Sequence, residues 1–253
     1  MIYITGDTHG DFHRFSTSRF PEQKEMTRDD FIIICGDFGG IWNGGNNEVY
    51  WLTWLSEKPF TFLFVDGNHE NFDRLYNDEF PVVDFHGGKA HKIRDNIYHL
   101  MRGQIFTLCG KTFFTFGGAS SHDIEDGILD EEDYPSYLEL RQDYNRRRRL
   151  GEFIRINHYS WWKEELPSDE EMEEGRRNLA AHDNQVDFVI SHSPPQQVCS
   201  TLGYHNPDRL TMYFYDLLEN GLKFKKWYSG HLHIEEIVMS KFCIHYEGIE
   251  RVV

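Results

Sequence analysis

The chain has few cysteines, a deficit of positive charge and no long apolar stretch. Its four cysteines are far apart and form no C-x-x-C pair, which indicates neither a zinc ribbon nor a disulfide scaffold; we expect reduced thiols. Lys and Arg number 26 against 42 Asp and Glu, a formal charge of −16. Such a charge opposes general adhesion to extended nucleic acid or anionic membranes, so neither partner is expected.

No segment approaches the roughly 18 apolar residues that cross a bilayer. The amino terminus lacks a basic region followed by an apolar stretch and a cleavage site, so we expect a cytoplasmic protein. Aromatic residues make up 15 % and hydrophobic residues 39 % of the 253 residues, which excludes a disordered chain. We expect one domain over residues 1–253 with a large buried core.

Apolar runs alternate with segments of helical pattern. The runs at 1–5, 31–35, 60–65 and 187–190 predict buried strands, and helices are predicted near 46–58, 70–77, 168–182 and 208–220. Asn46 or Asn47 is expected to cap the first helix, and Ser168-x-x-Glu171 forms a capping box at the start of the third. A two-residue turn at 110–111 predicts a hairpin. These signals favour an α/β fold with mixed sheets. Residues 119–186 are highly charged and aromatic, and we interpret them as a helical insert or cap.

Side chains of the types that bind metal ions follow five expected strand ends, those of the four runs above and that of the segment 226–228. In chain order they are Asp7 and His9, Asp37, Asn68 with His69, His192, and His231 with His233. Strand ends at one sheet edge converge, so we expect these groups to meet. The mixture of oxygen and nitrogen donors suits Mn²⁺, Fe or Zn²⁺ better than Ca²⁺. This set of donor groups is too large for one ion, but two ions bridged by a carboxylate would use all of it.

The motifs D-x-H, G-D, G-N-H-E, a lone His and G-H-x-H, in that order, resemble the calcineurin-like metallophosphoesterase superfamily. The resemblance covers residues 1 to about 118 and 186 to about 247. It implies a sandwich of two mixed β-sheets flanked by helices, and hydrolysis of phosphate esters at a dinuclear metal centre. Carried over by motif, it places Asp7, His9 and His233 on one ion and Asn68, His192 and His231 on the other. Asp37 would bridge the ions, and His69 would be the general acid.

The substrate is less narrowly indicated. The motif sequences G-D-T-H-G and G-N-H-E are those found in serine/threonine phosphoprotein phosphatases. In that branch two arginines bind the dianion of a phosphomonoester, and this chain lacks both. Phe38-Gly39-Gly40-Ile41 and Asp66 stand in their places, and the acid at 66 should make the field less favourable to a dianion. We therefore favour a phosphodiester or a small nucleotide-type substrate. A phosphomonoesterase, a nuclease and a non-catalytic metal-binding scaffold are the alternatives.

Mn²⁺ is the first expected metal, with Fe, Zn²⁺ and Ni²⁺ as alternatives. Candidate substrate-binding residues are Arg14, which follows the first motif, His122, which follows a strand end, and Arg146 with Arg147 in the insert. Arginines on a helix are also typical of a solvated face. Glu70 is expected to orient a neighbouring loop or to sit favourably at a helix N-terminus. The oligomeric state is not indicated.

Overall fold

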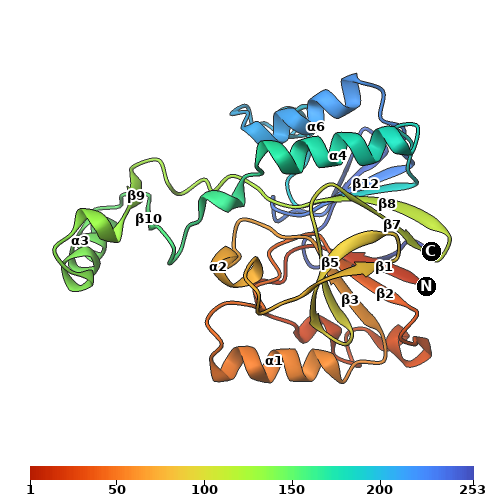
Figure 1. Ribbon diagram of the computed structural model, residues 1–253, viewed down its shortest axis with the longest axis horizontal. Coiled ribbons are helices and arrows are strands. Elements are labelled where there is room, and N and C mark those ends of the chain that lie inside the picture. Colours follow the sequence, from red (N-terminus) through yellow and green to blue (C-terminus); the bar gives the residue numbers. More distant parts are fainter.

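Two mixed β-sheets stack face to face in the computed structural model, which describes residues 1–253 (Figure 1). In spatial order the first sheet contains β15 (Ile249–Arg251), β1 (Ile2–Thr5), β2 (Phe31–Ile34), β3 (Thr61–Phe64), β6 (Ile97–Leu100), β5 (Gly88–Arg94) and β4 (Val82–Phe85). The second contains β13 (Glu236–Val238), β14 (Phe242–Ile244), β12 (Lys226–Ser229), β11 (Phe188–Ser191), β8 (Lys111–Phe116) and β7 (Gln104–Leu108). The predicted sandwich of two mixed sheets flanked by helices is confirmed.

The central strands are apolar throughout because both of their faces are covered. Ile2 and Ile4 of β1 point into the core between the sheets, whereas Tyr3 packs on the outer side of the first sheet. Strands β1, β2 and β3 run parallel, with Ile2 opposite Phe31 and Phe31 opposite Thr61. The loops that follow these strands therefore emerge at one edge of the sheet.

Helices cover the two outer faces. In Figure 1, α1 (Asn46–Ser56) lies over the first sheet, and α4 (Asp169–Ala181) and α6 (Arg209–Glu219) lie over the second. The short helix α2 (Phe72–Leu75) adds Leu75 to the apolar cluster on the outer face of the first sheet, and α5 (Gln196–Thr201) adds Val198 to the cluster on that of the second. The predicted capping box at the start of α4 is present. No helix is both long and apolar enough to cross a membrane.

The start of α1 differs from the prediction that Asn46 or Asn47 caps it. Its N-cap is Gly45, which has no side chain to accept a hydrogen bond. The preceding loop is held by Glu48 instead, whose Oε2 accepts from the backbone N–H groups of residues 42, 43 and 44 at 2.7–2.9 Å. A carboxylate in the first turn also interacts favourably with the helix dipole.

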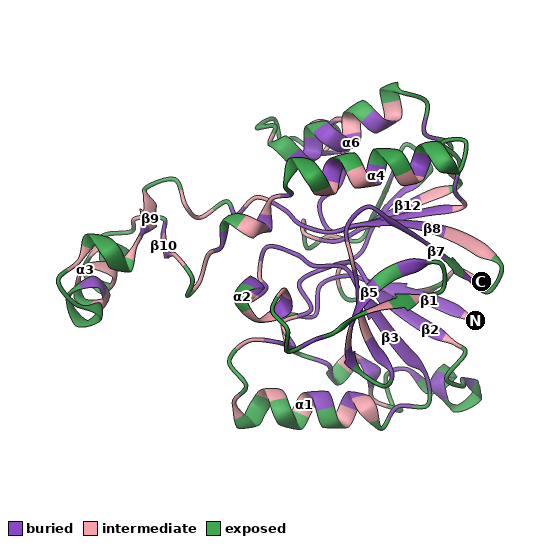
Figure 2. Ribbon diagram, viewed as in Figure 1, coloured by how far each residue is buried: buried purple, intermediate pink, exposed green.

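Residues 123–162 project from the sheets and are called the arm (Figure 1). It contains β9 (Gly127–Leu129), α3 (Tyr137–Arg149) and β10 (Ile154–Ile156), with β9 and β10 paired in parallel. Its core has only four buried residues: Leu129, Leu140, Ile154 and Ile156. Figure 2 shows how much of the arm is exposed. Helix α4, at the far end of the predicted insert, packs on the second sheet through Met172 and Leu179.

Candidate metal centre

The seven predicted metal ligands come from loops that follow five strands and converge where the two sheets meet. Asp7 and His9 follow β1, Asp37 follows β2 and Asn68 follows β3, whereas His192 follows β11 and His231 and His233 follow β12. Contacts between the loops of the two sheets confirm the convergence: the backbone N–H of His231 donates to Asp7 Oδ1 at 3.0 Å.

One group of ligands is formed by Asp7, His9 and His233. His233 Nε2 lies 3.1 Å from Asp7 Oδ2 and 3.0 Å from His9 Nε2. His9 Nε2 is 3.8 Å from the same carboxylate oxygen. Two imidazole nitrogens and a carboxylate oxygen at this spacing form a donor set suited to a first-row divalent cation.

Asp37 connects this group to a second one. Its Oδ2 lies 3.7 Å from His9 Nδ1 and 3.4 Å from His192 Nε2. His192 Nε2 is in turn 3.3 Å from Asn68 Oδ1. Asp7, Asp37 and His192 are also close enough to hold a single ion. A carboxylate between two donor groups is in the position that a bridging ligand requires.

The backbone at the centre is strained at four of the seven ligands. His9, Asp37, His231 and His233 have φ values of 46°, 48°, 67° and 51°. Non-glycine residues in this left-handed region cost roughly 1–3 kcal/mol each and persist where function requires the geometry. The strain thus falls on four of the seven predicted ligands.

Glycines make room for the ligands. A Cβ on Gly36 would lie 2.2 Å from His192 Nδ1, and one on Gly67 would lie 2.0 Å from Asp37 Oδ1. Both contacts are shorter than any real Cβ contact, so a side chain at either position would displace a ligand. The glycines of the G-D and G-N-H-E motifs are therefore required by close packing around the centre.

Buried carboxylates and imidazoles share the centre, and their pKa values respond to one another. Burial alone would raise the pKa of Asp37. The nearby His192, His69 and His9 have a larger, opposite effect, so the pKa of Asp37 lies below its usual range. Burial lowers the pKa of His231 far below the ordinary value and also lowers that of His9. Neutral imidazoles and ionised carboxylates are the forms that bind metal ions.

Two ligands have the opposite shifts: burial raises the pKa of Asp7, and the charges of Asp37 and Asp7 outweigh burial and raise the pKa of His192 to about 10. Metal binding would displace the proton of His192. The donor atoms themselves are of the kinds that fit a pair of divalent cations.

Hydrogen bonds behind the ligands fix their orientation. His192 Nδ1 lies 2.7 Å from the Cys35 carbonyl oxygen, to which it donates, and this leaves Nε2 free for a metal. Asn68 Nδ2 donates to Ser121 Oγ at 3.3 Å, and Ser121 Oγ donates to Glu165 at 2.6 Å. This chain turns Asn68 Oδ1 toward His192. Glu165 is buried and was not predicted, because nothing in its charged segment distinguishes it from surface acids.

Glu70 orients a loop, which is one of the two roles considered for it. It is buried, and its Oε1 accepts from the backbone N–H of Phe38 at 2.6 Å. Burial, followed by the charge of Asp37, raises its pKa well above the ordinary value. Glu70 thus holds the loop that carries Asp37.

The expected effect of Asp66 on the field at the site is not observed. Asp66 is fully buried, and Arg102 donates to its Oδ2 from Nε at 2.9 Å. His99 Nε2 lies 3.1 Å from the other carboxylate oxygen. Burial raises the pKa of Asp66, but Arg102 and His99 lower it more, to below its usual range. The negative charge is neutralised within the fold by Arg102.

Two cavities flank the centre, and His69 lines both. The arm-side cavity, of about 310 Å³, is lined by Asp37, Asn68, His69, His122, Asp123, Arg155, Tyr204, His231, Leu232 and His233. The tryptophan cavity, of about 390 Å³, is lined by His9, Gly10, Phe12, Gly39, Gly40, Trp42, Asn43, Asn47, Glu48, Trp51 and His69. His69 uses its backbone N–H to donate to Asp37 Oδ1 at 2.8 Å, and burial lowers the pKa of its ring.

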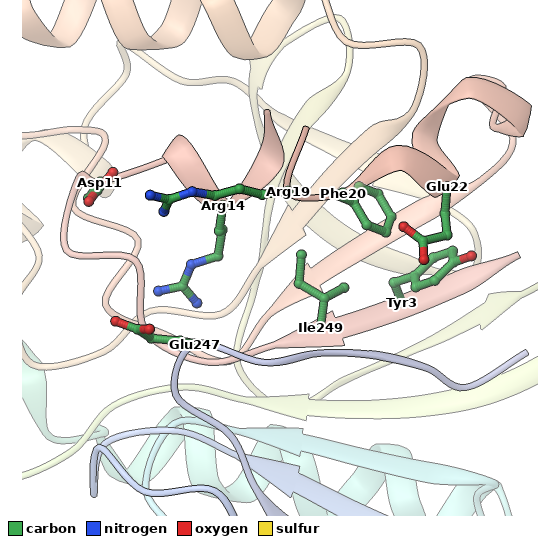
Figure 3. Close-up of a pocket in the computed structure, with 8 residues that line it drawn as sticks. All are labelled: Tyr3, Asp11, Arg14, Arg19, Phe20, Glu22, Glu247 and Ile249. Carbon is green, nitrogen blue, oxygen red and sulfur yellow. The ribbon is translucent and has the colours of Figure 1, made fainter. Parts of the chain in front are cut away.

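The four predicted substrate-binding residues are not brought together. His122 lies in the arm-side cavity, with Nε2 3.0 Å from His231 Nε2. Arg14 lies in a separate cavity, shown in Figure 3, and donates to Asp7 O and Tyr246 O at 2.6 Å. Arg146 and Arg147 are on α3 in the arm, where they pair with Asp143 and Glu152. Their carboxylate partners agree with the solvated-face interpretation.

Arg155 of β10 is the one arginine that lines either cavity at the centre. Its guanidinium is held by Asp123, with Nε–Oδ distances of 2.9 and 2.8 Å, and its Nη1 donates to Ser160 O at 3.1 Å. Arg155 was not predicted, because no motif marks a single arginine on a short strand of an insert.

Known proteins resemble this chain along most of its length. It is 27 % identical to lariat debranching enzyme A of Xenopus laevis over 149 residues, 53 % of this chain and 26 % of the relative. It is 25 % identical to the lariat debranching enzyme of Danio rerio over 255 residues, 92 % of this chain and 40 % of the relative. The chain thus spans less than half the length of either enzyme.

A solved structure, the putative 5′-nucleotidase from Staphylococcus aureus in complex with alpha-ketoglutarate, aligns with 98 % of this chain and 49 % of its own length. The TM-score is 0.46 and the sequence identity 17 %. A match to the calcineurin-like phosphoesterase family extends over residues 1–235, which includes every predicted ligand. The chain therefore belongs to the calcineurin-like phosphoesterase family, hydrolases that act on phosphate esters.

Proposed function

We propose that this protein hydrolyses phosphodiesters with the help of two divalent metal ions, Mn²⁺ being the first candidate. Asp7, His9 and His233 would hold one ion, Asn68, His192 and His231 the other, and Asp37 would bridge them. The bound ions would polarise the phosphate and activate water for in-line attack. The proposal is supported by the convergence of these side chains and by the family match.

One observation carries the preference for a diester: the only arginine in the cavities, Arg155, is already paired with Asp123. A terminal phosphate carries two negative charges and is best bound by unpaired guanidinium groups. An arginine–carboxylate pair has no net charge, so it suits the single charge of a diester better. The names of both curated relatives, lariat debranching enzymes, make a diester the first class to test.

His69 is proposed to act on the leaving group. It borders both cavities, and its contact with Asp37 is made by its backbone rather than its ring. The ring is thus free to donate a proton, or a hydrogen bond, to the oxygen that leaves phosphorus. Because its pKa is lowered, the neutral ring dominates at neutral pH and still offers one N–H.

The test compares bis-p-nitrophenyl phosphate with p-nitrophenyl phosphate in chelator-stripped protein to which Mn²⁺, Zn²⁺, Ni²⁺ or Mg²⁺ is added singly. We expect diester turnover to return with Mn²⁺ and to exceed monoester turnover. A monoester preference would instead support a phosphoprotein phosphatase-like activity. No turnover of either ester, with metal shown to be bound, would support a non-catalytic scaffold.

A further inference from the structure

The tryptophan cavity adjoins the reacting centre but contains none of the predicted ligands except His9. It meets the arm-side cavity at His69. A phosphate held at the centre would therefore face one cavity on each side. A diester, which carries two substituents on phosphorus, could place one in each.

The lining of the tryptophan cavity indicates the kind of group it accepts. The partly exposed rings of Trp42 and Trp51 supply aromatic surface, and Asn43 and Asn47 supply amides. Asn43 uses its Oδ1 to accept from Gly45, which leaves its NH₂ group unused. A planar heterocycle with hydrogen-bonding edges matches both kinds of surface, and base–aromatic stacking contributes roughly 1–3 kcal/mol per base.

The one charged residue in the lining, Glu48, is already paired. Arg74 Nη1 donates to both of its carboxylate oxygens at 2.7 and 2.8 Å, and one of these oxygens also accepts from three backbone N–H groups. The cavity consequently offers no free charge to attract an ion. This favours a neutral occupant over a second phosphate.

The aromatic walls are held in place before any ligand binds. Trp42 packs edge to face on the buried Trp162 of the arm, with ring centroids 5.5 Å apart. Its carbonyl oxygen accepts from Asn71 Nδ2 at 2.6 Å. Trp51 packs against Phe12 and Trp54 at 5.6 and 5.4 Å. Fixed rings lose little entropy on binding, and this preorganisation increases affinity.

We propose that the tryptophan cavity binds a nucleobase, so that the substrate is a nucleotide diester whose phosphate spans His69 and whose second substituent enters the arm-side cavity. The inference rests on the proposed function, because it assumes that phosphate occupies the metal centre. In this arrangement the arm contributes to both cavities: Arg155 lines the arm-side cavity, and Trp162 packs behind Trp42 of the tryptophan cavity.

The test measures binding of AMP, UMP and ribose 5-phosphate to the Mn²⁺-loaded protein by isothermal titration calorimetry. The three probes share sugar and phosphate, so their difference reports the base. We expect at least one nucleotide to bind roughly 5- to 150-fold more tightly than ribose 5-phosphate. In Trp51→Ala this ratio should fall close to one, while Trp51→Phe should retain most of it.

Val49→Ala is the control, because Val49 is exposed on the same helix and lies outside the cavity. Asn47→Ala, an exposed substitution in the first turn of α1, should weaken only nucleotide binding and tests the site even if Trp51→Ala folds poorly. Nucleotides that bind no more tightly than ribose 5-phosphate, or an equal loss in Val49→Ala, would overturn the inference. Hydrolysis of methyl p-nitrophenyl phosphate by the unaltered protein tests the proposed function separately, since this diester has no base.

Discussion

The two-sheet body has a much larger apolar core than the arm. The body has three large apolar clusters, one between the sheets and one beneath each helical layer. The arm has a core of four residues and nevertheless supplies Asp123 and Arg155 to the cavity at the metal centre. The difference teaches that the predicted metal ligands are all held by the body, whereas part of the cavity lining beside them is carried by an element with a small core.

The arm is tied to the body beside the site. Trp162 Nε1 donates to Asp73 Oδ2 of α2 at 2.7 Å, and His158 Nδ1 lies 2.8 Å from the other oxygen of that carboxylate. Glu165, just beyond the arm, supports Asn68 through Ser121. Local changes in the arm could therefore alter substrate contacts while the body stays folded.

The largest effect is expected in the body, from Asp37→Asn. The amide keeps the shape of the side chain but removes the charge that lies between both donor groups. We expect loss of bound metal and of measurable diester turnover, with the arm still folded. Metal analysis after dialysis and hydrolysis assays would check this. Full metal content in the variant would contradict the proposed bridging role.

His69→Ala should separate catalysis from metal binding. General acid–base groups contribute typically 10²- to 10⁴-fold, so we expect a loss of roughly that size in kcat. The metal content should not change, because the ring of His69 is not a proposed ligand. Normal turnover in this variant would show that the leaving-group role is wrong.

Leu140→Ala should unfold the arm alone. Removing a buried leucine side chain costs about 2–5 kcal/mol, which a core of four residues cannot compensate. We expect amides of residues 127–156 to lose protection from hydrogen exchange, and kcat/KM for diesters to fall, while the main thermal transition and the metal content stay unchanged. Leu63→Ala in the core between the sheets is the control and should lower the main transition. A similar decrease in Leu140→Ala would show that arm and body unfold together.

The same division explains how much could be predicted from the sequence. Runs such as Phe31–Ile34 are apolar on both faces and are soon followed by glycine. One pattern therefore predicted the strand, its covered position within a sheet and the place of the candidate ligand after it. The hairpin of β4 and β5 was missed, because exposed edge strands such as Val82–Phe85 lack a strong apolar run. Arg155 and Glu165 depend on how distant segments meet, which no local spacing records. The predicted helix near 70–77 is only the four-residue α2.

Leu140→Ala is expected to destabilise the arm alone, whereas a mild fall in pH should destabilise the body alone. Burial, followed by the neighbouring His99, lowers the pKa of His91 in the body to about 3, from 6.5. Between these values the unfolded chain binds a proton that the folded body does not. His91 alone therefore lowers the free energy of unfolding by about 2 kcal/mol as the pH falls from 7 to 5.

In the arm, hydrogen bonds to Asn157 and Arg146 lower the pKa values of Asp130 and Asp143 below the ordinary 3.8. Their contribution to stability is present above about pH 4 and is lost only below it. Denaturant melts of the body at pH 7 and 5 should therefore show the decrease, and His91→Phe should make it smaller. Hydrogen exchange in residues 127–156, corrected for the intrinsic rate, should be unaffected over the same range. If the arm opened between pH 7 and pH 5, its stability would depend on that of the body.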